Sequence, residues 1–218
     1  QMENRFQIKV NCIFNPLNKR EIIQKSKLKN KYKELFKVKK NTLKIINLGR
    51  FTEQKDQMTL LKAIKILKDK IKLKVFILGR GEKENELKKF IINNNLENTV
   101  KIINFINNPY PLINQSDFFI LTSKYEGLPN VLLEAAVLKK FIISTKCPTG
   151  PKEILLNGKG GMFFKIGDHN DLAKKITFCF KNKDKLKNKI YLTYKNLDKY
   201  DYNKNINQYY LLLKSFGV

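Results

Sequence analysis

The chain has 218 residues, which is enough for one compact α/β domain with an appendage and too few for two domains of about 150 residues each. Its 42% hydrophobic and 29% charged residues are ordinary for a globular core and exclude wholesale disorder, and no apolar run reaches the roughly 18–20 residues that span a bilayer. The net charge of +25 suggests nucleic-acid binding as one hypothesis. The three cysteines are too far apart for a disulfide framework, and a single histidine excludes a multi-histidine metal site.

Strand-like and helix-like patterns alternate along most of the chain. In chain order they predict a strand over residues 7–14, a helix over 21–32, a strand over 43–48, a helix over 57–69 with Asp56 as its N-cap, a strand over 73–78 and a helix over 82–94. They continue with a strand over 100–105, a short helix over 109–114, a strand over 118–121, a helix over 129–138, a strand over 141–144, a helical turn over 151–156, a strand over 161–164 and a helix over 171–180.

The predicted strands are continuous apolar runs rather than alternating ones, which is typical of strands covered on both faces. We therefore predict an α/β fold with a doubly wound parallel sheet in residues 1–180. Residues 181–218 are rich in Lys, Asn and Tyr and are expected to form a helical tail of two helices. Doubly wound sheets bind ligands beyond the carboxyl ends of their strands, and every motif described below lies there.

Two cations follow the strand over residues 43–48. Arg50 and Lys55 lie in the loop that begins at Gly49, where a planar guanidinium and a point charge can be aimed at one diphosphate. Arg50 is one of only four arginines in a chain that otherwise uses Lys, which favours a functional role, although ordinary surface cations also fit the pattern.

The turn Gly79-Arg80-Gly81-Glu82 follows the strand over residues 73–78. It resembles half of a dinucleotide fingerprint, but the third Gly is missing, so it is a weak indication of NAD. We predict a tight strand-to-helix turn that also lines the ligand crevice.

The most informative segment is Ser-Lys-Tyr-Glu-Gly-Leu-Pro-Asn-Val-Leu-Leu-Glu-Ala, residues 123–135. Glu126 lies in a loop, and Glu134 lies eight residues later, in the second turn of the helix that begins at Pro129. The backbone N–H groups near this helix N-terminus favour a phosphate. Glu134 lies in the apolar run Val-Leu-Leu-Glu-Ala-Ala-Val, where burying a carboxylate costs free energy unless it has a hydrogen-bond partner. Ribose hydroxyls would be such a partner. The alternative is that Glu134 caps the helix or forms a salt bridge.

These motifs carry a resemblance. Glu-x7-Glu after a Ser, with Gly-Arg-x4-Lys upstream, resembles the donor-binding half of the family 4 retaining glycosyltransferases, also called glycosyl transferases group 1, which have the GT-B architecture. The resemblance covers roughly residues 9–180. Ile-Phe-Asn-Pro at 13–16 is similar to the segment that opens the family's C-terminal domain, and residues 144–154 are similar to members that use UDP-linked hexoses or N-acetylhexosamines. The resemblance implies the Rossmann-like C-terminal half of a GT-B fold.

The resemblance also implies roles for individual residues. Arg50 and Lys55 match the positions that bind the donor diphosphate, and Glu126 matches the contact with the donor sugar, so these three are the expected catalytic residues. Glu134 matches the residue that holds the ribose, and Ile106 matches a position beside the base, whereas Asn104 departs from the Gly that the family commonly has. The expected donor-binding residues are Gly49, Arg50, Lys55, Gly79, Ile106, Glu126, Gly127, Leu128, Pro129, Asn130 and Glu134.

The implied activity is transfer of a hexose or N-acetylhexosamine from a UDP-sugar donor to a surface-glycan or lipid-linked saccharide acceptor. The sequence has no Asp-x-Asp pair, so neither a metal nor another cofactor is expected. The acceptor-binding N-terminal domain is expected in the same gene or in a separate chain, which leaves this chain incomplete as an enzyme. A cytoplasmic location is expected, with peripheral contact at the inner face of the cytoplasmic membrane.

Three alternatives stay open. The first is that the chain is the donor-binding subunit of a split glycosyltransferase. The second is that it is a non-catalytic remnant, and the third is that it is a basic nucleic-acid-binding module. The last alternative rests on charge alone, and 4 of the 44 basic residues are Arg while the rest are Lys, a bias typical of an A/T-rich coding sequence. Because the chain has neither an aromatic and Gly-rich RNA platform nor a basic recognition helix, no nucleic-acid partner is expected.

Overall fold

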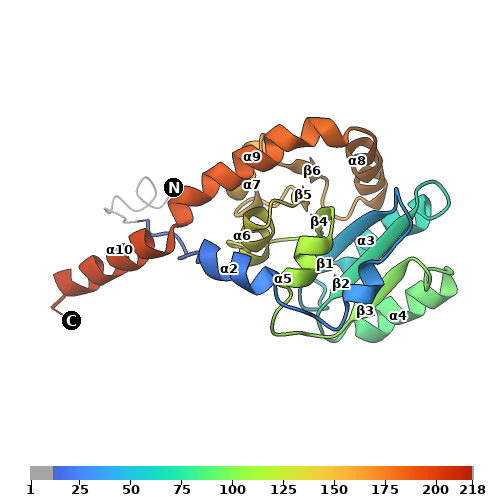
Figure 1. Cartoon of the computed structure of the whole chain (residues 1–218), viewed down its shortest axis with the longest axis horizontal. Helices are drawn as coiled ribbons and strands as arrows, with labels where there is room; N and C mark the ends of the chain where they lie inside the picture. Colours follow the sequence, from blue (N-terminus) through green and yellow to red (C-terminus); the bar gives the residue numbers. More distant parts are fainter. Residues whose placement is uncertain (1–11, 218) are drawn as a thin grey trace.

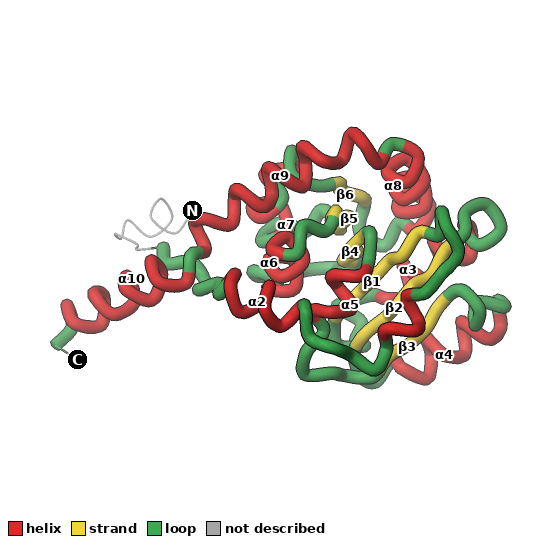
Figure 2. Tube along the Cα trace, viewed as in Figure 1, coloured by secondary structure: helices red, strands yellow, loops and turns green. Residues whose placement is uncertain are grey.

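A six-stranded parallel sheet crosses the middle of the molecule in the computed structural model, which describes residues 12–217 (Figures 1 and 2). Its strands are β1 (Leu43–Leu48), β2 (Leu73–Leu78), β3 (Val100–Ile103), β4 (Phe118–Leu121), β5 (Phe141–Thr145) and β6 (Met162–Phe164). They lie in the order β3-β2-β1-β4-β5-β6, and every neighbouring pair is parallel. This order confirms the predicted doubly wound α/β fold of the Rossmann type.

The direction of winding reverses between β1 and β4. The strands β2 and β3 lie on one side of β1, and β4, β5 and β6 lie on the other. Ligand crevices in such sheets open at the carboxyl ends of the two strands where the order reverses. The loops that follow Leu48 and Leu121 are therefore brought together at one edge of the sheet.

Helices cover both faces of the sheet (Figure 1). One face packs against α3 (Gln57–Leu67), α4 (Glu84–Asn93) and α8 (His169–Lys181), and the other against α2 (Lys19–Ser26), α5 (Tyr110–Gln115), α6 (Asn130–Val137) and α7 (Pro151–Ile154). Successive residues of one strand enter different cores: Ile45 is buried on the α3 side and Ile46 on the α6 side. Because both faces are covered, the strands are apolar throughout, as the sequence pattern predicts.

The C-terminal part of the chain contains the helices α9 (Leu186–Asn196) and α10 (Tyr202–Ser215). The first of them crosses between the two cores, since Leu186 is buried on the α8 side and Leu197, just past the helix, on the α6 side. The second extends beyond the sheet and its covering helices (Figure 2), where Tyr210 is 61% exposed. Within residues 12–217, no helix combines the length and apolar character needed to cross a bilayer.

The N-terminal segment differs from the prediction. Residues 7–11 of the strand predicted over 7–14 lie outside the described residues, and residues 12–14 are not in a strand. The Phe14 backbone N–H instead donates to Asn205 Oδ1 on α10 at 3.1 Å. The tail, rather than the sheet, therefore holds this segment.

Several predicted elements are longer than those in the structure, among them one helix and one strand. The helix predicted over residues 21–32 is α2, which ends at Ser26; further along, the Asn30 side chain accepts the Tyr32 backbone N–H at 2.9 Å and supports a turn that competes with helix. The strand predicted over residues 100–105 ends at Ile103. Residues 104–109 therefore form a loop at the carboxyl edge of the sheet.

Candidate donor-binding site

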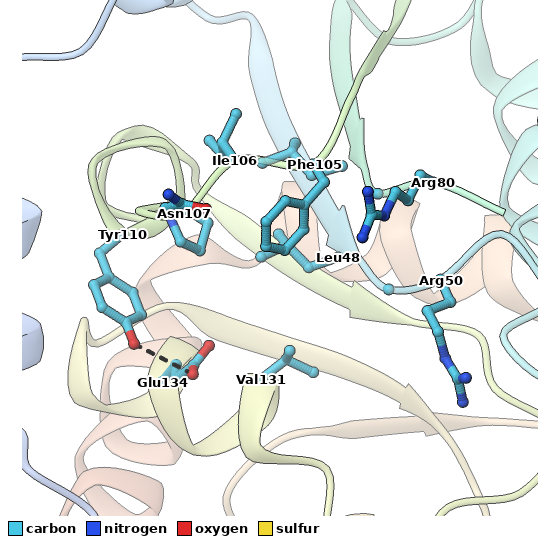
Figure 3. A pocket seen from close by; sticks show the side chains of 13 residues that line it. Leu48, Arg50, Arg80, Phe105, Ile106, Asn107, Tyr110, Val131 and Glu134 are labelled. Atoms are coloured by element: carbon cyan, nitrogen blue, oxygen red, sulfur yellow. Dashed lines mark hydrogen bonds between the residues drawn. The ribbon is translucent and has the colours of Figure 1, made fainter.

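A pocket of about 480 Å³ opens at the carboxyl ends of β1 and β2 (Figure 3). Its walls are mostly apolar and include Leu48, Leu78, Phe105, Ile106, Pro109 and Val131. Three charged side chains line it, with Arg50 and Arg80 on one side and Glu134 on the other (Figure 3). An apolar slot of this size with polar groups at its rim suits a planar ring that carries polar substituents.

Two glycines bring the loop after β2 against the loop after β1. A Cβ on Gly79 would lie 2.0 Å from the Gly49 carbonyl oxygen, and a Cβ on Gly81 would lie 2.5 Å from the Phe51 carbonyl oxygen, so neither position accepts a side chain. The Phe51 backbone N–H donates to the Arg80 carbonyl at 2.9 Å. The backbone of Arg80 is therefore fixed, while its exposed side chain reaches the pocket.

Glu134 lies in the second turn of α6 and faces the pocket (Figure 3). Its hydrogen-bond partner within the described residues is Tyr110, whose hydroxyl donates to Oε1 at 3.4 Å, longer than the usual range of about 2.5–3.0 Å. Burial raises the pKa of Glu134, and burial together with this carboxylate raises the pKa of Tyr110 to about 12. The Glu134 carboxylate therefore retains most of its capacity to accept hydrogen bonds from a ligand.

Lys55 and Glu126 form an ion pair beside this pocket. The Lys55 Nζ lies 2.6 Å from Glu126 Oε1, and the two side chains are 17% and 7% exposed. The Ser123 hydroxyl donates to the same Oε1 at 2.6 Å, while no residue in the described part of the chain hydrogen-bonds Oε2. The Lys55 side chain lies against Gly49, where an added Cβ would be 3.4 Å from Lys55 Cδ, so the pair adjoins the pocket wall.

The loop that carries Glu126 is held from the side of α7. The Thr149 hydroxyl donates to the Glu126 carbonyl at 2.7 Å. Gly150 has a φ of +70° and packs directly on the loop, because a Cβ there would lie 1.9 Å from the Gly127 carbonyl oxygen. The path of the loop thus depends on a glycine in a segment more than 20 residues away.

The N-terminus of α6 follows this loop. Pro129 precedes Asn130, the first helical residue, and supplies no capping side chain. The N–H groups of the first turn have no partner within the helix, and the helix dipole adds partial positive charge, so this end favours an anionic group. Arg50 forms no ion pair with any of residues 12–217, which leaves its guanidinium open to a ligand.

The structure places the sequence-predicted site residues in two neighbouring groups. The residues that line the pocket are Gly49, Arg50, Gly79, Ile106 and Glu134. The residues beside it, in the ion pair, the loop and the first turn of α6, are Lys55, Glu126, Gly127, Leu128, Pro129 and Asn130. Their roles toward a ligand remain predictions.

The pocket also contains residues that the predicted donor-binding set does not include. Arg80, Phe105, Asn107 and Tyr110 all line it. Arg80 carried a sequence signal, because it stands between two glycines after a strand and is one of four arginines. Tyr110 carried none, since its contact with Glu134 depends on the path of the loop over residues 104–109.

Comparisons with known proteins identify the family. Residues 28–196 match the family described as glycosyl transferases group 1. An uncharacterized glycosyltransferase of Methanocaldococcus jannaschii is 38% identical over 140 residues, which cover 64% of this chain and 34% of the relative. The N-acetylgalactosamine-N,N'-diacetylbacillosaminyl-diphospho-undecaprenol 4-alpha-N-acetylgalactosaminyltransferase of Campylobacter jejuni is 30% identical over 156 residues, which cover 67% of this chain and 42% of the relative.

Solved structures share the fold. A glycosyltransferase from Rickettsia africae superposes with a TM-score of 0.83 at 21% identity, over 98% of this chain and 60% of that one. The Anabaena protein HepE in complex with UDP-glucose superposes with a TM-score of 0.82 at 22% identity, over 94% of this chain and 57% of that one. The matched residues span only 34% and 42% of the two curated relatives, well under two thirds of their length. Since the family match covers most of its residues, the chain belongs to the glycosyl transferases group 1 family.

Proposed function

We propose that this chain is the donor-binding part of a retaining glycosyltransferase that transfers a hexose or N-acetylhexosamine from a UDP-sugar. The pocket carries this proposal: an incompletely partnered Glu134 carboxylate faces an apolar slot that Arg50 and Arg80 line from the other side. A nucleoside diphosphate presents a flat base, ribose hydroxyls and two phosphates, and the site has a matching group for each. The fold match to a protein crystallised with UDP-glucose supports uridine as the nucleoside.

Each part of the donor has a counterpart in the site. Glu134 accepts hydrogen bonds from the ribose hydroxyls. Arg50, Lys55 and the first turn of α6 hold the diphosphate and offset the negative charge that develops on it as the sugar leaves. Glu126 offers Oε2 to a hydroxyl of the donor sugar, while Lys55 and Ser123 hold its Oε1.

The acceptor in this proposal is a surface-glycan precursor or a lipid-linked saccharide, and its site lies in an N-terminal domain. The Campylobacter relative, whose name specifies a diphospho-undecaprenol-linked saccharide, supports this class of acceptor. The matched residues make up only 34% and 42% of the two curated relatives, so most of each relative lies outside the match. A separate acceptor-binding chain is the second arrangement that fits the same geometry.

Peripheral membrane contact is also part of the proposal. The net charge of +25 favours an anionic lipid surface such as the inner face of the cytoplasmic membrane. We expect the chain to co-sediment with phosphatidylglycerol vesicles and to be released as salt is raised. Equal sedimentation with neutral phosphatidylcholine vesicles would contradict an electrostatic contact.

Calorimetry with UDP in the presence of EDTA tests donor binding. We expect binding without a divalent metal, because two cations and a helix N-terminus supply the positive charge. Glu134→Gln should weaken UDP and UDP-sugar by the same factor, since the ribose is common to both. Glu97→Gln, an exposed carboxylate at the opposite edge of the sheet, is the matched control and should change neither. Binding by the wild-type chain only after Mg²⁺ is added would refute the metal-independent site.

Product formation tests how much of the enzyme this chain contains. Transfer requires both substrates at near-attack distance with water excluded, and a single wall of a cleft provides neither. The purified 218-residue chain, supplied with radiolabelled UDP-sugars and membrane lipid extracts, should therefore bind donor without transferring sugar. Robust turnover with no added partner would overturn the half-enzyme proposal.

A further inference from the structure

Arg80 and Phe105 form a pair at the mouth of the pocket for which the proposed donor contacts give no role. The Arg80 Cζ lies 5.4 Å from the centroid of the Phe105 ring, within the range of a cation–π interaction. Both residues line the pocket, and Phe105 is 60% exposed despite its size. Figure 3 shows the Arg80 guanidinium beside the Phe105 ring at the edge of the slot.

The position of this pair in the sheet separates it from the expected phosphate-binding groups. Arg80 follows β2 and Phe105 follows β3, whereas Arg50 follows β1 and the first turn of α6 follows β4. Neighbouring strands are about 4.8 Å apart, so β2 lies about 10 Å from β4 in the order β3-β2-β1-β4. A nucleoside diphosphate whose phosphates lie at α6 therefore reaches the pair with the opposite end of the molecule, its base.

The chemistry of the pair suits only some bases. Phe105 offers a flat apolar face on which any base can stack. The Arg80 guanidinium carries hydrogen-bond donors and no acceptor, so it favours a ring edge that carries carbonyl oxygens. Uracil has two such oxygens, whereas adenine has no carbonyl oxygen, accepts only through ring nitrogens, and presents an amino group that is itself a donor.

We propose that Arg80, stacked beside Phe105, selects the nucleobase of the donor and favours bases with ring carbonyl oxygens, such as uracil, over adenine. The inference rests on the proposed function, because it assigns the base of the same donor nucleotide. The main chain supports this inference, because the Phe51 N–H donates to the Arg80 carbonyl. Gly79 and Gly81, on either side of Arg80, let the turn pack against the loop after β1. A side chain on a fixed backbone discriminates between the hydrogen-bonding edges of bases better than a side chain on a mobile backbone.

Calorimetry of the full chain with pyrophosphate, UDP and ADP, at about 0.15 M salt, tests the inference. The wild-type chain should bind UDP more tightly than ADP. Arg80→Met should weaken UDP about tenfold or more while changing ADP and pyrophosphate less than about twofold, so the preference for UDP largely disappears. Arg80→Lys keeps the charge but not the planar fork and should not restore the preference.

Two variants complete the test. Arg50→Met, on the phosphate side of the pocket, should weaken all three ligands together and is the matched arginine control. Phe105→Leu should weaken UDP and ADP together and leave pyrophosphate unchanged, because it removes the stacking face.

Each remaining outcome overturns one stated claim. If Arg80→Met lowers the affinities for pyrophosphate and UDP equally, Arg80 is a phosphate ligand. If the ratio of UDP affinity to ADP affinity does not change, Arg80 does not select the base. Either outcome overturns the inference and leaves the proposed function standing. A wild-type chain that binds pyrophosphate but neither nucleotide would overturn the proposed function itself. Circular dichroism of each variant confirms that it is folded before its affinity is interpreted.

Discussion

The Lys55 ammonium lies 2.6 Å from the Glu126 carboxylate, so the two side chains predicted to hold different parts of the donor are already paired with each other. Their exposed fractions of 17% and 7% mean that salt screens the pair only weakly. A diphosphate that enters the site must therefore share Lys55 with Glu126. Under the proposed function, the carboxylate therefore opposes binding of the phosphates, while its Oε2 stays available to the donor sugar.

Replacing Glu126 with Gln should separate these two effects. Glu126→Gln removes the negative charge that competes for Lys55, so pyrophosphate should bind about threefold more tightly. UDP-sugar should lose affinity relative to UDP, because the sugar hydroxyl loses the carboxylate that accepts its hydrogen bond. Competition calorimetry in EDTA measures both. Glu53→Gln is the control: this carboxylate pairs with Lys83, which precedes α4, and with Lys124, in the loop that carries Glu126, but it is 69% exposed, so its loss should change pyrophosphate affinity less than about twofold. Weaker pyrophosphate binding in Glu126→Gln would mean that the carboxylate orders Lys55 for the ligand.

Removing the Arg50 guanidinium should weaken every diphosphate ligand. Arg50 is exposed, lines the pocket and has no ion-pair partner within residues 12–217, so its charge is free to meet a phosphate. Arg50→Ala should cost about 1.5–3 kcal/mol of UDP affinity, the usual contribution of a charge-assisted hydrogen bond. Arg20→Ala, an exposed arginine on α2 outside the pocket, should change the affinity by less than about 0.5 kcal/mol. Similar losses in both variants would indicate a general effect of net charge.

The raised pKa of Glu134 predicts a conflict between binding and stability. Burial raises this pKa in the folded chain above the usual value of a Glu carboxyl, so the folded state holds the proton more tightly than the unfolded state. The free energy of unfolding therefore falls as pH rises from the unfolded pKa to the folded one, and stays lower above it. Glu134→Gln should stabilise the ligand-free chain by about 1 kcal/mol at pH 7, because a neutral amide is cheaper to bury. Urea denaturation at several pH values measures this.

The same shift predicts the pH dependence of nucleotide binding. The affinity of the wild-type chain for UDP should fall as pH is lowered through the raised pKa of Glu134, since the protonated acid accepts fewer hydrogen bonds from ribose. The Glu134→Gln variant should be weaker throughout and lack this step. A variant that is both less stable at pH 7 and unchanged in affinity would assign Glu134 a purely structural role.

Gly150 and Gly167 provide a matched pair for testing the loop that carries Glu126. Their φ angles are +70° and +72°, but a Cβ on Gly150 meets the Gly127 carbonyl oxygen at 1.9 Å, whereas a Cβ on Gly167 meets nothing within 4 Å. Gly167→Ala should cost only the backbone strain of about 1 kcal/mol. Gly150→Ala should cost about 3 kcal/mol and weaken UDP as well, because the loop must move. Thermal unfolding and calorimetry compare the two variants, and equal costs would refute the steric argument.

The sheet and the meeting of the loops follow from local features of the sequence. Runs such as the one around Ile45 and Ile46 are apolar at every position because both faces are buried, and this pattern can be read without the fold. Lys55 and Glu126 are 71 residues apart, yet each follows a strand, and parallel strands in this fold class end at the same edge. The sequence therefore predicts that they approach each other, although not that they form an ion pair.

The remaining contacts depend on paths that no local pattern specifies. The cation–π pair of Arg80 and Phe105 exists because β3 ends at Ile103, two residues earlier than the apolar run predicts, and residues 104–109 turn across the pocket. The contact between Tyr110 and Glu134 arises in the same way, from where that loop delivers α5. Both contacts depend on how the whole domain packs, rather than on the helix or strand propensity of the segment that contains them.

The buried amide of Asn205 ties the segment at Phe14 to the start of α10. It accepts the Phe14 N–H and donates to the carbonyls of Lys199 and Asp201, at 3.1, 2.9 and 2.8 Å. Asn205→Ala should speed hydrogen exchange at the Phe14 amide, because its acceptor is lost. The adjacent Asn15 side chain donates to Asn130 Oδ1 at 3.2 Å, so the same short segment also contacts the first turn of α6. The two residues Phe14 and Asn15 therefore connect α10 directly to the N-terminal turn of α6, two elements that are more than 60 residues apart in the sequence.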